Sequence, residues 1–509
     1  MLQPKQKLIR TMAVMMASVL SLSALAACSG NGEQADDTER VLRIATTQGY
    51  GPNDEWFRQQ FTELYEFAHP NVTIEIVPAV DYSKMNYNPT PAQPQEMPDP
   101  MVEIKKMMEG DNPPDLVMVE YQQLSELIND NLLAPLDTYI TKDEFDTSKI
   151  VPTVYNGIKD LAADGKLYAL APLFNSSALF YNKTIFDQAG VGRPTDGMTW
   201  DEVFQLAQQV SSGQGDERIY GFGFSTYKGT DPFWEMQMYT QPLQLRYFDE
   251  NGERMTVDTD QWEMVWRKVI DLRKQEIIPG PIDYNNQPVV KEPGPYDWDN
   301  FLSGKQAMGI NSYYYINEII GANQMAQTNG NTRMTPIEWD VVTIPVHPDA
   351  PDIGGNIYMQ GLMGINAKAQ NPEDAWEFIK FVNGDDWARL KSRSQSTLVS
   401  NVDYIQPREG LDYNVGAFYQ LKPAPIQDDS KIYQRYPNIY MVQQTGQQKF
   451  QEALNGDKEV RQALKEWQTE GDAMLQEMKE NPGAVTPYGE PMPIDVEMES
   501  DEAVKAVEG

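Results

Sequence analysis

Few side chains of this 509-residue sequence are of the types used in nucleophilic or metal chemistry. It contains two histidines, His69 and His347, each followed by proline, and a single cysteine, Cys28. A Ser-His-Asp triad or a histidine-rich metal site would need such residues, so we expect no catalysis, no metal and no cofactor. Asp297 and Asp299 could form the acid–base pair of a glycosidase. Because 75 acidic residues make chance pairs common, solvated surface is the better interpretation.

The charge balance excludes one broad class of partner. With 41 basic and 75 acidic residues the formal charge is −34. A nucleic acid backbone needs a basic surface, so we expect no nucleic acid partner. The length is too great for one hydrophobic core, which predicts two or more domains.

The N-terminus has the pattern of an export signal. Lys5, Lys7 and Arg10 precede an uncharged stretch over residues 11–32, whose apolar part covers residues 12–27. This is the layout of a secretory signal peptide. Its end, Leu25–Cys28 (LAAC), resembles a bacterial lipobox, in which the cysteine becomes the acylated first residue. An ordinary signal peptide with an incidental Cys28 is the alternative. We expect residues 1–27 to be removed, which gives a charge of −34 − 3 = −37, and 28–40 to be a flexible tether.

Strands and helices alternate after the tether. Apolar runs predict strands at residues 41–46, 72–77 and 116–119, with helices over 53–67 and 101–109 between them. This alternation predicts an α/β lobe. Ligands bind such sheets at the carboxyl ends of the strands. The polar and aromatic residues that follow the strands are therefore candidates, among them Thr47, Gln48, Tyr50, Glu120 and Tyr121.

The segment from Gly165 to Gly190 organises the rest of the chain. Two apolar extended runs are separated by the polar break Phe174–Ser177 (FNSS). We interpret this segment as a crossing between two lobes, with Asn175 facing a cleft. Later, a capping box at Thr199 and Glu202 predicts the start of a helix.

Several short motifs follow one another in a family-specific order. They are residues 114–117 (PDLV), 165–172 (GKLYALAP), 178–183 (ALFYNK), 199–202 (TWDE), 301–308 (FLSGKQAM), 371–381 (NPEDAWEFIKF) and 452–467 (EALNGDKEVRQALKEW). In this order the chain resembles the extracellular solute-binding proteins of bacterial ABC importers, specifically the sugar-binding family typified by maltose-binding protein.

The resemblance implies a two-lobe α/β fold of the type II periplasmic-binding-protein kind, with a ligand cleft between lobes that close about a hinge. It implies crossings near residues 172–177, just before Val341, and near Gly384. The N-lobe would comprise 41–172 and 341–384, and the C-lobe 173–340 and 385–480. Residues 481–509 form an acidic tail that we expect to be disordered. Two insertions, 78–100 and 278–298, exceed the compact family pattern.

The resemblance also implies the ligand contacts. Sugars stack on aromatic rings and hydrogen-bond to a few placed polar groups. The residues carried over are Gln48, Tyr50, Glu120, Tyr121, Asn175, Phe233 and Trp234. Tyr313, Tyr315 and Tyr358 are added from loop position alone. The tryptophans on amphipathic helices, Trp200, Trp262, Trp376 and Trp467, are expected in the core.

The expected protein is thus a lipid-anchored monomer on the outer face of the bacterial membrane. It would capture an oligosaccharide and deliver it to a permease without chemistry. A membrane-tethered carbohydrate-active enzyme, or a protein of the same fold for peptides or another small solute, remain alternatives.

Overall fold

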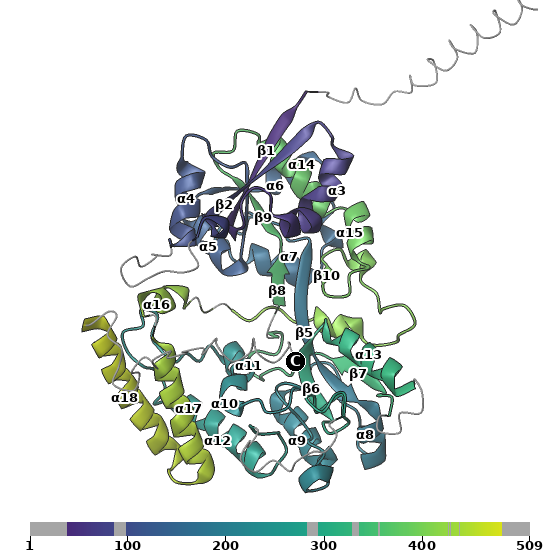
Figure 1. The fold of residues 1–509 in the computed structure, drawn as a ribbon, viewed down its shortest axis with the longest axis vertical. Coiled ribbons are helices and arrows are strands. Elements are labelled where there is room, and N and C mark those ends of the chain that lie inside the picture. The colour runs from purple at the N-terminus through teal and green to yellow at the C-terminus, as the bar shows by residue number, and fades with distance from the viewer. Residues whose placement is uncertain are drawn as a thin grey trace, which may run out of the picture.

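The protein consists of two α/β lobes joined at a narrow waist (Figure 1). The computed structural model describes residues 38–85, 98–281, 294–327, 335–354, 357–425, 427, 429–436 and 438–480. The predicted signal peptide, Cys28, the tether up to residue 37 and the acidic tail lie outside the described residues, as do 86–97 and 282–293 of the two insertions.

The first lobe is built on a five-stranded sheet in the described part of the chain. Its order is β2 (Val72–Asp81), β1 (Arg40–Gly49), β3 (Leu116–Val119), β9 (Leu362–Asn366) and β4 (Leu133–Ala134). β1 pairs in parallel with β2 and β3, whereas β9 is antiparallel to β3. The three predicted strands are confirmed. The carboxyl ends of β1, β2 and β3 therefore lie at one edge of this sheet.

Helices cover the faces of this sheet. The predicted helix after β1 is present as α2 (Glu55–Phe57), the π-helical turn η1 (Arg58–Thr62) and α3 (Glu63–Ala68). It begins at Asp54, whose carboxylate accepts from the Phe57 amide at 3.0 Å. The other helices of this lobe are α4 (Pro100–Glu109), α5 (Tyr121–Asn129), α6 (Asp137–Lys142), α7 (Pro152–Lys159), α14 (Pro372–Val382) and α15 (Asp385–Lys391).

The second lobe is built around β5 (Leu173–Asn182), which pairs antiparallel with β6 (Met308–Ser312) and β7 (Trp339–Val342). The predicted capping box is confirmed, because the Thr199 amide donates to Glu202 at 2.8 Å and the Glu202 amide to Thr199 at 3.3 Å. It starts α9. The helices of this lobe are α8 (Lys183–Ala189), α9 (Trp200–Val210), α10 (Pro232–Glu235), α11 (Gln237–Thr240), α12 (Asp260–Lys274), α13 (Tyr315–Gln327), α16 (Ser430–Arg435), α17 (Tyr440–Asn455) and α18 (Val460–Glu480).

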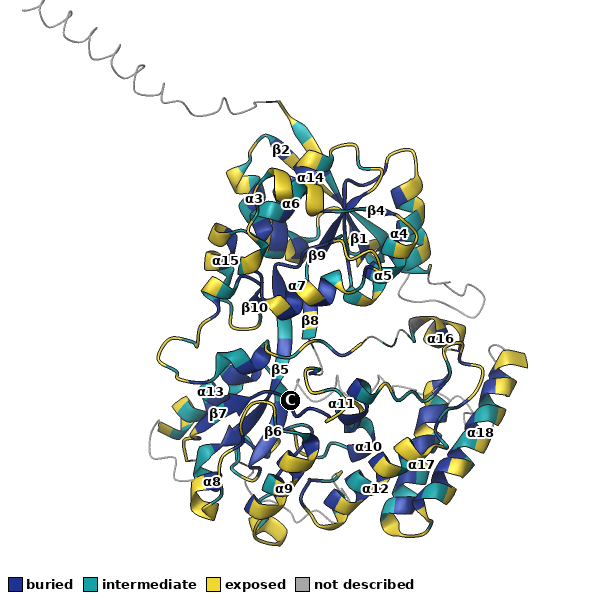
Figure 2. Cartoon of the chain, turned by 180° about the vertical axis from the view of Figure 1, so that it is seen from behind, coloured by how far each residue is buried: buried dark blue, intermediate teal, exposed yellow. Residues whose placement is uncertain are grey.

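Burial follows the layers: the strands and the inward helix faces are buried, and the outward helix faces are exposed (Figure 2). The tryptophans predicted in the core, Trp200, Trp262, Trp376 and Trp467, are all buried. Among the described residues no helix combines the length and the apolar character needed to cross a membrane.

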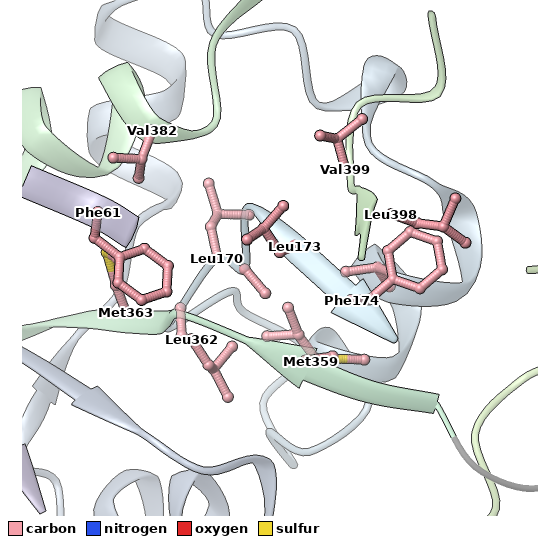
Figure 3. Packing of buried hydrophobic residues seen from close by; sticks show 14 of the residues in the cluster. Phe61, Leu170, Leu173, Phe174, Met359, Leu362, Met363, Val382, Leu398 and Val399 are labelled. Atoms are coloured by element: carbon pink, nitrogen blue, oxygen red, sulfur yellow. The ribbon is translucent and has the colours of Figure 1, made fainter. Parts of the chain in front are cut away.

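In the waist, three strands of the described chain run side by side. The first half of β5 pairs with β8 (Ile357–Gln360) on one side and β10 (Leu398–Val399) on the other. Figure 3 shows the buried side chains of these strands packed together, with Phe61 beside Met363 of β9. Gly361 has φ +69°, and a Cβ there would lie 2.5 Å from Phe61 Cε1, so the position needs glycine.

Three details of the predicted crossings are wrong. The break at 174–177 does not interrupt the strand, because β5 is continuous over ten residues. Val341 pairs with Phe180 in the second lobe, so the second crossing falls at β8 and not before residue 341. The chain does not leave the first lobe at Gly384, because Trp387 of α15 packs into the same core as α14.

β10 runs antiparallel to β5, back toward the first lobe, where the Ser400 carbonyl accepts from the Val151 amide and the Asn401 side-chain amide donates to Asp385. The third crossing therefore follows residue 401, before Arg408 reaches Tyr313 and Asn317 of the second lobe.

Candidate functional site

A cavity of about 790 Å³ opens between the lobes. The first lobe lines it with the N-terminal parts of α4 and α5, including Glu120 just before α5. The second lobe contributes α11 and the segment from there to Tyr247, together with side chains of α12, α16 and α17 and of the segment just before α16. The cavity therefore has walls from both lobes, and its volume is within the range of small-molecule sites.

Side-chain amides and charged groups share the polar lining of this cavity. Of the described residues that line it, six are glutamines: Gln122, Gln123, Gln237, Gln241, Gln427 and Gln443. The charged side chains are mostly paired with one another. Arg246 contacts Asp429, and Lys105 Nζ lies 2.6 Å from Glu126. An amide offers both a donor and an acceptor without net charge, which suits a neutral polar ligand.

Two nitrogen donors in the lining have no protein acceptor. Arg246 Nε and Gln427 Nε2 are buried, and neither has a hydrogen-bond partner among the described residues. A buried donor left unpaired costs free energy, so such atoms call for a ligand oxygen. Burial raises the pKa of the neighbouring Tyr247 to about 12, so that phenol stays protonated at neutral pH. The lining is thus rich in donors.

Three of the sequence-predicted residues come together at the waist. The Tyr358 hydroxyl donates to the Glu120 carboxylate, and Asn175 is the cross-strand neighbour of Tyr358. Partial burial, and then Glu120, raise the pKa of Tyr358. Of these three, Glu120 lines the inter-lobe cavity.

Gln48 and Tyr50 form a second group at the carboxyl ends of β1 and β2. Tyr82 donates to Gln48 Oε1 at 2.6 Å, and its ring centroid lies 5.8 Å from that of Tyr50. Both predicted residues are exposed, but they are not among the described residues that line the cavity. Tyr121 points elsewhere, because its hydroxyl donates to the Gly157 carbonyl at 2.7 Å.

Four more of the predicted residues lie outside the described cavity lining. Phe233, Tyr313 and Tyr315 are buried, so their rings are not available to a solute in this conformation. Phe233 packs against Trp467 in the second core, and Tyr313 against the Arg408 guanidinium. Trp234 is partly buried against that core and is not part of the described cavity lining. Loop position predicted exposure, but Phe233 and Trp234 lie in the short helix α10 and Tyr315 begins α13, and both helices pack onto a core.

Asp297 and Asp299, the pair considered for catalysis, were predicted to be solvated surface, and one of the two is not. Asp297 is exposed, whereas Asp299 is fully buried and not solvated surface. Asp299 accepts from Thr226 and from Tyr315, each at 2.8 Å, and burial raises its pKa. These hydrogen bonds connect Asp299 to Thr226 and Tyr315, so its role is structural. Among the described residues no group of three or more His, Cys, Asp or Glu side chains could hold a metal ion.

An exposed aromatic pair was missed from sequence. Tyr227 and Trp298 stack with centroids 5.7 Å apart and an interplanar angle of 22°. They are 44% and 45% exposed. The segment before Tyr227 runs parallel to β6, with Gly223 bridged to Gly309, so Tyr227 lies near the carboxyl end of β6. At that end Ser312 pairs with Ser177 of β5, close to the waist. The rule used for β1 and β3, applied to residues 220–226, would have found Tyr227.

The comparison with known families now identifies the class. Residues 49–389 match the family described as bacterial extracellular solute-binding protein, and the chain belongs to this family. It is a solute-binding protein of the kind that serves ABC importers, as predicted, with the two-lobe fold of that class.

Curated relatives are distant. The chain is 27% identical over 344 residues to an arabinooligosaccharide-binding protein of Halalkalibacterium halodurans, which covers 66% of each chain. It is 24% identical over 275 residues to the protein of that name from Bacillus subtilis, covering 53% of this chain and 56% of the relative. A binding protein of Brucella abortus is 24% identical over 323 residues, covering 61% and 70%.

Solved structures with similar folds agree with the class. A sugar transporter protein from Rhizobium etli in an open conformation has a TM-score of 0.54 at 20% identity, covering 85% of this chain and 99% of that one. An extracellular solute-binding protein of family 1 from Alicyclobacillus acidocaldarius has a TM-score of 0.54 at 14% identity, covering 86% and 98%. At these identities the likeness concerns the fold.

Proposed function

We propose that the protein captures a neutral oligosaccharide in the inter-lobe cavity and delivers it to the permease of an ABC importer. The observation that carries this proposal is the lining: glutamine amides from both lobes, mutually paired charges, and the unpartnered donors Arg246 Nε and Gln427 Nε2. A sugar presents hydroxyl oxygens to such donors and has no net charge to be neutralised.

Aromatic surface supports a sugar in particular. The stacked pair Tyr227 and Trp298 is half exposed in the second lobe and outside the described cavity lining, so it offers a flat apolar face to a sugar ring that extends beyond the cavity. On the first lobe, the exposed ring of Tyr50 beside Tyr82 can act in the same way. The relatives named arabinooligosaccharide-binding proteins make arabino-oligosaccharides the first ligands to test.

Binding is coupled to the waist. The β5 and β8 strands and the chain after β10 connect the lobes, and a ligand held by both lobes favours the conformation in which both walls touch it. The hydrogen bond between Tyr358 and Glu120 joins the waist strand β8 to the first lobe, so a movement of the lobes about the waist would act on this contact. The protein performs no reaction on its ligand in this proposal.

The rest of the proposal concerns location and partners. Cys28 carries the lipid that holds the protein to the outer face of the membrane, since each buried CH₂ of an acyl chain adds about 0.8 kcal/mol. The lobes 41–172 with 341–384 and 173–340 with 385–480 were expected; with the crossings at β5, at β8 and after β10, we now propose boundaries near residues 174 and 358 and between 401 and 408. The mature protein acts as a monomer that docks on the permease.

Thermal unfolding with a panel of arabino-, malto- and manno-oligosaccharides and peptides tests the function. A neutral oligosaccharide should raise the melting temperature with its concentration by mass action, and chromatography should recover it unchanged. A shift with peptides alone would refute the sugar proposal. Shortened saccharide products would instead favour the carbohydrate-active enzyme.

A further inference from the structure

A second cavity of about 620 Å³ adjoins the inter-lobe cavity, which is called the first cavity below. Gln122, Glu126 and Lys431 line both. The second cavity is bounded by α5 and α7 of the first lobe and by residues 422–425, which lie against α7: a Cβ on Gly157 would be 3.2 Å from Pro423 Cγ. The two cavities therefore meet at side chains of α5 and α16.

The contact at this junction is weak. Lys431 Nζ on α16 lies 3.5 Å from Glu126 Oε1 on α5, and the Lys431 side chain is 69% exposed. Figure 1 shows α16 lying between the lobes near α5. Exposed ion pairs of this kind contribute little to stability. Glu126 also has a closer partner, Lys105, at 2.6 Å, so it stays neutralised when Lys431 moves aside.

The second cavity has the chemistry of a sugar subsite. Tyr121, Leu161 and the two prolines at 423 and 425 provide apolar surface, and Ser125 and Asn129 provide uncharged polar groups. The described lining also has five charged residues, Glu126, Asp130, Asp160, Lys422 and Lys431, and all of them except Asp160 form ion pairs. The bond from the Tyr121 hydroxyl to Gly157 fixes its ring in place. This explains how Glu120 and Tyr121, neighbours in sequence, can both be ligand contacts: Glu120 lines the first cavity and Tyr121 the second.

We propose that one oligosaccharide chain occupies both cavities, passing between α5 and α16 at Glu126 and Lys431, so that the protein prefers chains longer than the first cavity can hold. The inference rests on the proposed function and adds to it a chain-length preference and a location for the extra sugar residues. The volume of each cavity alone falls within the range of small-ligand sites, which is roughly 300–1,000 Å³. The combined volume of the two cavities is therefore larger than a short saccharide needs.

Isothermal titration with ladders of arabino- and malto-oligosaccharides, from the disaccharide upward, tests this on the full mature protein. The variant Ser125→Trp fills the second cavity from α5 without touching the first, and Asn129→Trp fills it from an independent position. Thr141→Trp is the matched control, because Thr141 is exposed on α6 and lines neither cavity.

For the wild type and the control, affinity should rise with chain length beyond the saccharides that the first cavity accommodates. Both second-cavity variants should lose this rise, with long chains weakened about tenfold or more and the shortest binders within about twofold. If the wild type binds short and long chains equally, or if both variants keep the length dependence, the inference is wrong while the proposed function stands. If no saccharide of either ladder binds the wild type, the proposed function fails and the inference with it.

Discussion

Removal of the Trp298 ring should weaken carbohydrate binding while the fold persists. The side chain is 45% exposed, which leaves about 110 Å² of the roughly 250 Å² of a tryptophan available to a ligand. A sugar ring that covers half of it buries about 55 Å², worth about 1.4 kcal/mol at 25 cal/mol per Å². Trp298→Ala should therefore raise the dissociation constant about tenfold.

Titration calorimetry on the best oligosaccharide of the panel measures this change, and thermal unfolding without ligand checks the fold. Loss of the stack on Tyr227 should cost about 0.5–1.5 kcal/mol of stability, a small effect for a half-exposed pair. Phe67→Ala is the control, since Phe67 is 88% exposed on α3 and its loss should leave affinity unchanged. Equal affinities for wild type and Trp298→Ala would refute the assignment of this ring to the ligand surface.

Three further predictions concern the cavity, the second core and the anchor. Arg246→Lys keeps the positive charge but removes the unpartnered Nε donor, so ligand affinity measured by calorimetry should fall about tenfold, whereas Arg218→Lys, whose guanidinium binds backbone carbonyls elsewhere, should not change it. Burial raises the pKa of Glu235 to about 7, above its value of 4.5 in the unfolded chain, so stability should fall as pH rises from about 4.5 through 7. Glu235→Gln should remove that slope in urea titrations at several pH values; an unchanged slope would assign it to other groups. Cys28→Ala should move the protein from the membrane fraction to the medium in cell fractionation, and membrane retention would refute the lipid anchor.

Local signals predicted the strands of the first lobe and helix starts in both lobes. β1, β2 and β3 are apolar runs with clear ends, and the caps at Asp54 and Thr199 depend on residues within one helical turn. Such features involve neighbours in sequence, so single-sequence reasoning could find them. The rule that strand ends gather at one edge then pointed to Glu120, which does line the cavity.

The crossings failed for a different reason. β7 has the composition of any buried strand, and only its pairing with β5, more than a hundred residues earlier, assigns it to the second lobe. The break at Gly384 looked like an exit, but Trp387 returns the chain to the first core. The partner of a strand is distant in the sequence, so the burial pattern of one strand does not indicate which strand it pairs with.

The aromatic candidates show the same limit at the level of single side chains. Phe233 and Trp234 are adjacent, yet one is fully buried and neither lines the described cavity, whereas Trp298 is half exposed. An aromatic side chain can pack in a core or lie on a ligand surface, because its ring is apolar in either place.

By itself, the sequence determined the class of protein: ordered motifs, with local helix and strand signals, indicated a two-lobe solute-binding fold. Tertiary structure alone decided where the chain changes lobes and which side chains form the cavity. No local signal marks Gln122, Gln237 and Gln443 as neighbours, and only the packing of the two lobes brings these glutamines of α5, α11 and α17 to one cavity. A binding site made from both lobes depends on contacts between distant segments, and those contacts exist only once the chain has folded.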